Sequence, residues 1–300
     1  MAIRINRTRK TSPTARNLAA SLTTTVPNTK RLKLENSTWR GTPTDLLINW
    51  GSTQLHTTNA FVLNPPTAIA NSVNKLTTFG YLREARVSVP RVIPTSTSYE
   101  VISAIAEEVY HENVDTLLLR TTATGHGGEG IHVLTSIRTL LLDGDDLEDL
   151  DDYYSLFENY LTNDPYWSDV IRRTKFVSTY FKARDEFRVH VFLNSVIHTQ
   201  RKGLRTDDQR PENPNFFVRN HENGFVFQIN DITIPPHVLE ASVRAVDALG
   251  LHFGAVDVRY NQEHNTYCIL EVNSAPALTG TTLEKYTEAF TNFHTALQSN

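Results

Sequence analysis

The chain has 300 residues and a formal net charge of −4, with 39% hydrophobic and 21% charged residues, and this composition is typical of a globular protein with a sizeable core. The negative charge excludes bulk binding to nucleic acid or to an anionic membrane surface, because both require a basic excess. The single cysteine, Cys268, excludes an internal disulfide and a cysteine-based zinc site, and no apolar run approaches the roughly 20 residues that span a bilayer. We therefore expect a cytoplasmic protein without a membrane partner.

Residues 1–72 are predicted to form an amino-terminal α/β domain. An alternating segment at 2–6 indicates a strand, and a helix follows with Ser12 as N-cap and Pro13 at its first position. The apolar segment that stops at Gly51 indicates a buried strand. Short strands around one helix are typical of an open α/β unit.

The same segment begins with a group of basic residues. Such a group either attracts an acidic partner, such as a peptide or a nucleotide, or is simply solvated. Its members are Arg4, Arg7, Arg9, Lys10 and Arg16.

Residues 73–182 are predicted to form a small central domain. A helix is expected over 72–85 and another over 99–112, and the apolar segment after the second helix indicates a strand that ends at Arg120. The acidic run from Asp143 to Asp152 does not have the spacing of a calcium-binding EF-hand loop. We interpret it as the solvated start of a helix.

A glycine-rich stretch, "TTATGHGGEGI", lies between this strand and a β-rich segment, and it matches G-x-G-x-x-G at Gly125, Gly127 and Gly130. A dinucleotide-binding turn would need a helix directly after the glycines, and an NTPase P-loop would need Lys-Ser or Lys-Thr. A protein kinase would need H-R-D and D-F-G motifs, which the sequence lacks. A phosphate-covering flap between two strands and a plain flexible loop both remain.

Residues 183–300 are predicted to form a mainly antiparallel sheet domain that ends in a helix. Within it, residues 253–274 are expected to form a hairpin with a turn near Gln262 to Asn265. Alternation along its strands puts Asp257 and Arg259 on one face of the first strand, and Glu271 and Asn273 on one face of the second.

Two carboxylates and an amide on facing strands form an all-oxygen set that suits Mg²⁺, or Mn²⁺ in its place. Two acids that face each other across a hairpin repel unless a cation lies between them. The alternative is that the acids pair with Arg259 on the sheet surface. We predict Asp257, Glu271 and Asn273 as metal ligands.

The segment before this hairpin offers groups for a nucleotide. Backbone groups of Tyr180 and Phe181 suit an adenine edge, and Glu186 can accept hydrogen bonds from ribose hydroxyls. Several nearby cations either contact phosphate or substrate or are ordinary surface charges. These are Lys182, Arg188, Arg201 and Lys202.

Together these motifs resemble the ATP-grasp superfamily, in particular the ligases similar to glutathione synthetase and to the enzyme that adds glutamate to a ribosomal protein. The similarity covers most of the chain, and "GAVDVRY" with "ILEVNSAPAL" is its most specific part. The resemblance implies an α/β (α+β) fold of ATP-grasp architecture, with a pre-ATP-grasp domain, a lid domain and a domain that carries the metal.

The resemblance also implies a role for each candidate residue. It implies that Asp257, Glu271 and Asn273 bind the metal and that Arg188, Lys202 and Arg259 are the catalytic cations, with Arg201 beside Lys202. The residues implied to bind ATP are Lys75, Arg120, Gly125, His126, Gly127, Gly128, Glu129, Gly130, Tyr180, Phe181, Lys182 and Glu186. At position 120 the family usually has lysine, so Arg120 replaces a point charge with a planar fork.

The implied reaction joins a carboxylate to an amine through an acylphosphate, with ATP and Mg²⁺ as cofactors. The carboxylate partner is a small molecule or a peptide, and a homo-oligomer is an open option. Two alternatives stay open on the residues alone: a nucleotide-binding regulatory module without ligase activity, which the departure at Arg120 favours, and a small-molecule kinase.

Overall fold

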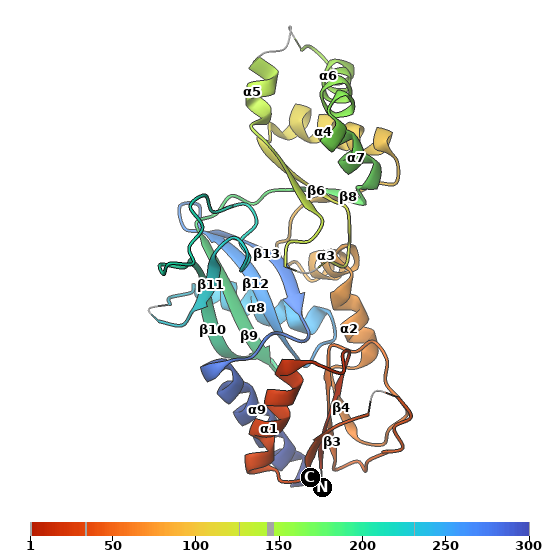
Figure 1. Cartoon of the computed structure of the whole chain (residues 1–300), viewed down its shortest axis with the longest axis vertical. Coiled ribbons are helices and arrows are strands. Elements are labelled where there is room, and N and C mark those ends of the chain that lie inside the picture. The colour runs from red at the N-terminus through yellow and green to blue at the C-terminus, as the bar shows by residue number, and fades with distance from the viewer. Residues whose placement is uncertain (1, 34, 126, 143–146, 231, 300) are drawn as a thin grey trace. The chain divides into compact units, whose positions relative to one another are not determined.

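The computed structural model describes residues 2–33, 35–125, 127–142, 147–230 and 232–299 (Figure 1). The chain forms two compact units. The first unit contains residues 1–88, 184–201 and 228–300, and the second contains residues 89–183 and 202–227. The division into domains at residues 72 and 182 is finer than this one and stays a prediction.

The first unit contains a parallel four-stranded sheet in the order β2-β1-β3-β4. Helix α1 (Pro13–Thr25) connects its first two strands, and the Ala15 backbone N–H donates to the Ser12 hydroxyl, so Ser12 and Pro13 begin the helix as predicted. The strands are β1 (Ile3–Arg7), β2 (Thr29–Arg31), β3 (Leu46–Trp50) and β4 (Phe61–Leu63).

An antiparallel sheet in the order β11-β10-β9-β12-β13 follows, and the chain passes from the first unit to the second within β10, after Arg201. Its strands are β9 (Asp185–Phe192), β10 (Ser195–Leu204), β11 (Phe225–Gln228), β12 (Phe253–Asn261) and β13 (Thr266–Asn273). Helix α8 (Pro236–Ala248) packs on β9, β12 and β13. The predicted hairpin is therefore present as β12 and β13.

Where a single helix was expected over 72–85, the chain has two. Helix α2 (Pro66–Val73) ends and α3 (Lys75–Glu84) begins on either side of Asn74. The Asn74 side chain accepts hydrogen bonds from the Leu76 and Thr77 backbone N–H groups and so caps α3. This break puts Lys75 in the first turn of a new helix.

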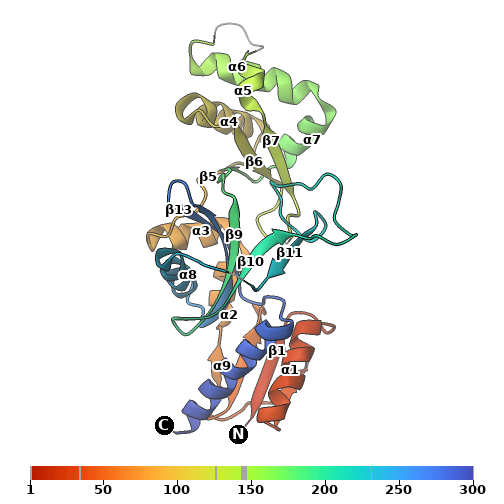
Figure 2. The ribbon, with the colours of Figure 1, turned by 90° about the vertical axis from the view of Figure 1, so that its left-hand side faces the viewer.

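An aromatic cluster joins the two sheets of the first unit. Trp50, at the end of β3, stacks on Phe253 of β12 with ring centroids 5.3 Å apart. Tyr286 and Phe290 of α9 (Gly280–Gln298) meet Trp50 edge-on. Figure 2 shows α9 beside α1, and the Thr287 hydroxyl of α9 donates to the Ser21 hydroxyl of α1 at 2.9 Å.

The second unit has a four-stranded antiparallel sheet in the order β5-β8-β6-β7. Strands β6 and β7 flank the glycine loop, so the predicted arrangement of strand, loop and strand is confirmed. The strands are β5 (Val92–Pro94), β6 (Thr116–Arg120), β7 (Ile131–Thr135) and β8 (Phe176–Thr179).

Four helices pack around the core of this unit. Residues 143–146 of the acidic run lie outside the described residues. At its end the Asp149 side chain accepts from the Asp152 backbone N–H in a capping box, as expected for a helix start. The helices are α4 (Ser98–Glu112), α5 (Ile137–Leu142), α6 (Leu150–Asn163) and α7 (Pro165–Arg173). Across the part of the chain that the structure describes, none of the helices has the length and apolar character needed to cross a membrane.

A buried histidine lies at the centre of the antiparallel sheet. His190 of β9 is fully buried, with its Nδ1 3.2 Å from the Tyr286 hydroxyl and its Nε2 3.0 Å from Gln200 Oε1. Burial lowers its pKa from 6.5 to about 4, although the hydrogen bond to Gln200 acts in the opposite direction. His190 is therefore neutral in the folded protein at neutral pH.

This burial predicts a pH dependence of stability. Between pH 6.5 and 4 the unfolded chain binds a proton at His190 that the folded chain does not, so the free energy of unfolding falls as the pH falls through this window. The full contribution is about 3 kcal/mol. Urea unfolding at several pH values should show a shallower dependence for His190→Gln than for the native chain. The exposed His264 provides the control, and His264→Gln should keep the pH dependence of the native chain. The same pH dependence of the free energy of unfolding in all three proteins would contradict the prediction.

Candidate functional site

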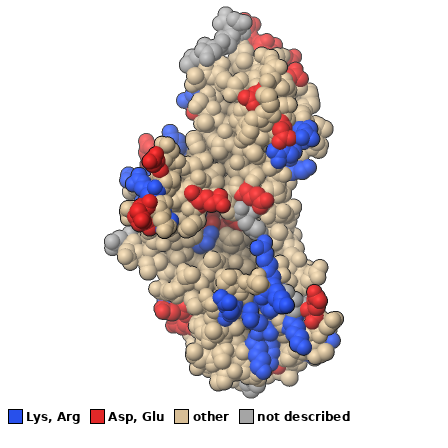
Figure 3. All heavy atoms as spheres, in the orientation of Figure 1, with Lys and Arg blue, Asp and Glu red and all other residues tan. Residues whose placement is uncertain are grey.

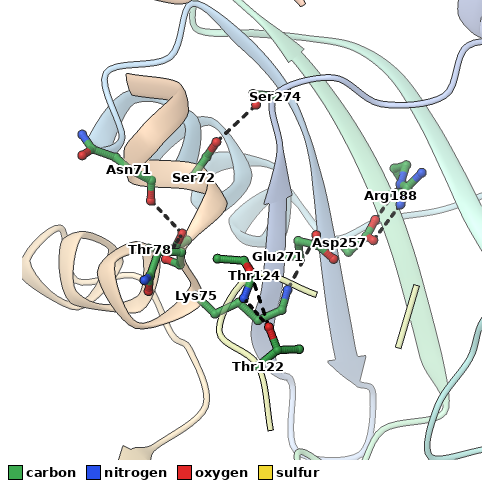
Figure 4. A network of polar contacts seen from close by, with 11 residues as sticks. Asn71, Ser72, Lys75, Thr78, Thr122, Thr124, Arg188, Asp257, Glu271 and Ser274 are labelled. Carbon is green, nitrogen blue, oxygen red and sulfur yellow. Dashed lines mark hydrogen bonds and ion pairs between the residues drawn. The ribbon is translucent and has the colours of Figure 1, made fainter. Parts of the chain in front are cut away.

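Three charged residues lie in one row across neighbouring strands of the first unit. Asp257 of β12 is in register with Arg188 of β9 on one side and with Glu271 of β13 on the other. Residues in register on neighbouring strands point to the same face of a sheet. The row therefore projects from one face, as Figure 4 shows.

Arg188 and Asp257 form a two-pronged ion pair. Arg188 Nε donates to Asp257 Oδ1 at 2.6 Å, and Nη2 donates to Oδ2 at 2.7 Å. The side chains are 14% and 8% exposed, so little water screens the pair. Burial alone would lower the pKa of Arg188, but the carboxylates of Asp257 and Glu271 raise it above its ordinary value.

A β-bulge fixes which residues of β13 join this row. Asp257 pairs with Glu271, but the next residue, Val258, pairs with Ile269, so Leu270 has no partner on β12. The bulge keeps Glu271 beside Asp257 and also turns the buried Ile269 to the face that carries Val258. That apolar face packs on α8.

Each of the two facing carboxylates has a cation of its own. Lys75, in the first turn of α3, lies with its Nζ 3.6 Å from Glu271 Oε1, and Arg188 holds Asp257 (Figure 4). The repulsion expected between Asp257 and Glu271 is therefore relieved by side chains of the protein. This repulsion therefore does not require a metal, and only the donor atoms favour one.

The donor atoms fit a metal ion that keeps other ligands. Asn273 is in register with Ala255, two residues along from Asp257 and Glu271, so the amide belongs to the same face. Among the described residues no group of three or more His, Cys, Asp and Glu lies close enough to hold a metal. Two carboxylates and an amide suit Mg²⁺, which takes few protein ligands and fills its other positions with water and phosphate oxygens.

The remaining candidates of the first unit form two more ion pairs on β9. Arg259 Nε donates to Glu186 Oε2 at 3.2 Å, and both side chains are at most 5% exposed. Arg201 Nη2 donates to Asp185 Oδ1 at 2.6 Å, with the Arg201 side chain 43% exposed. Glu186 and Arg259, assigned to ribose and to catalysis, thus lie together in a buried pair.

The second unit carries the other candidates. Arg120 is the last residue of β6, and its backbone carbonyl accepts from the Lys175 N–H at 2.7 Å. Tyr180, just after β8, meets Phe217 with ring centroids 5.2 Å apart. Phe181 and Lys182 follow in the same irregular segment. Lys202 places its ammonium over the Phe227 ring, 5.3 Å from the centroid.

The glycine loop has a backbone that only glycine adopts readily. Gly127, Gly128 and Gly130 have φ of 61°, 93° and 67°. A Cβ at Gly128 would lie 2.4 Å from the Val218 side chain, and Asn220 Nδ2 donates to the Gly127 carbonyl at 2.6 Å. The Thr121 N–H donates to the Gly130 carbonyl at 2.9 Å and closes the loop.

Of the two other residues of this loop that are assigned to ATP, Glu129 lies in the turn and His126 lies outside the described residues. The loop as a whole is held within the second unit through the segment that contains Val218 and Asn220.

No pattern in the sequence indicates this supporting segment. The side chain of Asn215 accepts from the Phe217 and Val218 N–H groups, and Arg219 Nη2 donates to the Ala183 carbonyl at 2.8 Å. Such a turn depends on one asparagine side chain. It lies 85 or more residues from the glycine loop in sequence, so no local pattern could connect the two.

Comparison with known proteins identifies the fold of the chain. No family model matches the chain, and no curated protein matches its sequence. Solved structures match over its whole length. The ATP-grasp ligase PsnB, complexed with a minimal precursor, is 16% identical, with 98% of this chain and 99% of that chain covered and a TM-score of 0.62.

Two other solved structures agree. D-alanyl-alanine synthetase A from Vibrio cholerae O1 biovar eltor str. N16961 is 12% identical, with 100% of this chain and 99% of that chain covered and a TM-score of 0.60. The macrocyclase MdnC from Microcystis aeruginosa MRC, bound with precursor peptide MdnA, is 10% identical, with 98% and 99% covered and a TM-score of 0.57. The predicted fold is confirmed.

The Arg188 pair should be essential for stability. Arg188→Met leaves the Asp257 carboxylate buried without its main partner, and we expect the free energy of unfolding to fall by about 3–5 kcal/mol. Arg201 gives a matched control on the next strand, because its pair with Asp185 is more exposed. Arg201→Met should cost less than about 1 kcal/mol. Urea unfolding at neutral pH measures both, and similar losses would contradict this account.

The two central glycines of the loop should differ in tolerance. Gly127→Ala places a Cβ in open space, so we expect a loss of about 1 kcal/mol from its backbone conformation alone. Gly128→Ala adds a clash with Val218 to its own unfavourable φ and should cost about 1–3 kcal/mol more. Thermal unfolding followed by calorimetry compares the two variants. Equal melting temperatures would show that Val218 does not support the loop.

Proposed function

We propose that this chain, which has the ATP-grasp fold, is an ATP-dependent ligase that joins a carboxylate to an amine. The reaction passes through an acylphosphate and releases ADP and phosphate. The observation that carries the proposal is the row of Arg188, Asp257 and Glu271 on one face of the antiparallel sheet. The fold alone would not indicate a ligase, because one fold can host many functions.

The proposed metal site is supported by the oxygen atoms of three side chains. Asp257, Glu271 and Asn273 would hold Mg²⁺, and Mn²⁺ suits the same oxygen ligands. A carboxylate offers about four acceptor positions, so a carboxylate that accepts from Arg188 or Lys75 can also ligate a metal. When bound, the metal neutralises the negative charge of the phosphates. PsnB has been solved with a minimal precursor, Mg and ADP, which supports this choice of cofactors.

The nucleotide assignments follow from the resemblance of the sequence to ATP-grasp ligases. The residues assigned to ATP are Lys75, Arg120, Tyr180, Phe181, Lys182 and Glu186. The loop Gly125–Gly130 is assigned to the phosphates, because its glycines leave backbone N–H groups free of flanking side chains. Arg120 keeps the positive charge that a lysine would supply.

The chemistry needs no covalent nucleophile from the protein. An oxygen of the substrate carboxylate attacks the γ-phosphorus of ATP, and ADP leaves. The amine then attacks the acyl carbon, loses a proton, and phosphate leaves as the amide bond forms. Arg188, with Lys202 and Arg259, would stabilise negative charge that develops in these steps. The single cysteine is buried, which raises its pKa to about 12, so Cys268 is not a nucleophile at neutral pH.

The carboxylate is proposed to belong to a peptide or an amino acid. PsnB has been solved with its precursor peptide PsnA2 and AMPPNP, and MdnC is bound with its precursor peptide MdnA. D-alanyl-alanine synthetase A is named for a dipeptide product, which is built from amino acids. Both classes present a carboxylate and an amine, so both belong in a substrate panel.

The test is ADP release with a panel of peptides and amino acids, each with and without an amine. Hydroxylamine in place of the amine converts an acylphosphate into a hydroxamate, which is read by mass spectrometry. A kinase that acts on a hydroxyl group would release ADP without hydroxamate, and a binding module would release none. A panel that yields neither amide nor hydroxamate with any member overturns the ligase.

A charge-neutralising substitution should separate the metal role from folding. Glu271→Gln keeps the shape of the side chain but removes a metal-binding charge, and we expect kcat/KM to fall at least about hundredfold. Glu263, exposed in the turn of the same hairpin, is the control, and Glu263→Gln should keep activity within about twofold. Titration of Mg²⁺ should show that the variant needs more metal. Full activity of Glu271→Gln would remove this residue from the metal site.

A further inference from the structure

The positive charge of the chain is concentrated at its beginning. Residues 1–64 contain nine Lys and Arg and two Asp and Glu, a net charge of +7 in a chain whose total is −4. On the face drawn in Figure 3, Lys and Arg side chains gather over the part of the first unit that holds α1. Such an asymmetry creates a local field that attracts anions, although the protein as a whole is acidic.

Some of these cations end or follow β1 and β2, at the edge where open α/β sheets bind ligands: Arg7, Arg9, Lys10, Arg31 and Lys33. The chain moves from β1 to β2 on one side and then returns past β1 to β3 on the other. The carboxyl ends of β1 and β3 therefore form a topological switch point, which is the usual ligand position in such sheets. The Thr8 hydroxyl, just after β1, donates to the Gly51 carbonyl, just after β3, at 2.7 Å.

Arg7 is the residue at this edge that points most directly to a ligand. It ends β1, in register with Trp50, and is only 8% exposed. Its Nη1 donates to the Leu32 carbonyl after β2 at 2.5 Å, but its Nε is buried and has no hydrogen-bond partner among the described residues. Within the same described part of the chain, no Asp or Glu pairs with the guanidinium.

The surroundings of Arg7 make this charge costly. Burial lowers its pKa, and the positive charge of Arg31, the last residue of β2, lowers it further. The next cations along the chain, Arg9, Lys10 and Lys33, are exposed and add to the same sign of charge. A buried charge is ordinarily paired, so Arg7 lacks the anion that would stabilise it.

We infer that the carboxyl edge of the amino-terminal sheet is an anion-binding site, in which Arg7 binds a carboxylate or phosphate group and Arg31 and Lys10 add long-range attraction. The guanidinium fork suits planar or tetrahedral oxyanions, and its buried Nε is a donor that no group among the described residues satisfies. The site lies on another sheet from Asp257 and Glu271 and does not depend on the proposed ligase reaction.

A purely structural role for Arg7 makes a different prediction. If Arg7 served only to hold β2 through the Leu32 carbonyl, its loss would destabilise the fold equally with and without an anion. If it awaits a ligand, the anion-free protein should tolerate an apolar replacement, because burial of an unpaired charge is unfavourable.

The experiment titrates the full chain, free of nucleotide and metal, with inorganic phosphate and separately with glutarate at constant ionic strength. Calorimetry measures affinity, and thermal unfolding measures the stabilisation that binding produces. We expect at least one of the two anions to bind and to raise the melting temperature. Phosphate alone or glutarate alone identifies the source of the oxyanion, and binding of both supports a shared site. Binding of neither overturns the proposal.

Three variants test whether the anion binds at the carboxyl edge of the amino-terminal sheet. Arg7→Met should weaken anion binding at least about tenfold and should abolish the anion-dependent rise in melting temperature. Arg31→Gln, at an exposed position that cannot disrupt the core, should weaken binding about two- to fivefold even if Arg7→Met fails to fold. Arg244, exposed on α8, is a charge-matched control, and Arg244→Gln should change affinity less than about twofold.

Two results would overturn the site. One is native affinity in Arg31→Gln and in a folded Arg7→Met, and the other is an equal loss in Arg244→Gln, which would reduce the effect to net charge. Glu271→Gln should bind the anion as the native chain does. Because this readout needs no turnover, failure of the ligase assay would leave the anion site standing, and loss of anion binding would leave the ligase proposal standing.

Discussion

The candidate site depends on the register of three antiparallel strands. Because β9, β12 and β13 pair so that Arg188, Asp257 and Glu271 lie side by side, two carboxylates are held on one face without the help of a loop. The bulge at Leu270 is what allows this, since it turns Ile269 and Val258 together toward α8 while Glu271 stays beside Asp257. A rigid sheet can hold ligating atoms more closely than a mobile segment can.

The row is also electrically balanced before any ligand binds. Arg188 is paired with Asp257, Lys75 with Glu271 and Arg259 with Glu186. Paired in this way, charges that would be prohibitive alone can be buried in a sheet. A metal that joins Asp257 and Glu271 would shift this balance toward positive charge. The change would favour the arrival of polyphosphate, which is consistent with a metal that binds together with its nucleotide.

Local patterns in the sequence were sufficient for the elements and for the facing strands. The alternation around Asp257 and Glu271 and the capping residues Ser12 and Pro13 report short-range rules, and the structure follows them. The partners of the row were not predictable in this way, because Lys75 and Glu271 are separated by 196 residues and meet only through tertiary packing. The bulge depends on which face α8 covers, so no single strand sequence specifies it.

Arg188 and Arg7 are both largely buried, but they differ in how their charge is paired. Arg188 is 14% exposed in its side chain and has a carboxylate on two of its nitrogens, so its charge is satisfied within the fold. Arg7 is 8% exposed, yet among the described residues its guanidinium donates to a neutral carbonyl and pairs with no carboxylate, and the charge of Arg31 has the same sign. Folding stability alone would favour an apolar side chain at position 7, because a buried charge without a partner is unfavourable. The presence of Arg7 therefore needs another explanation. A bound anion would explain both the buried charge of Arg7 and the cations around it.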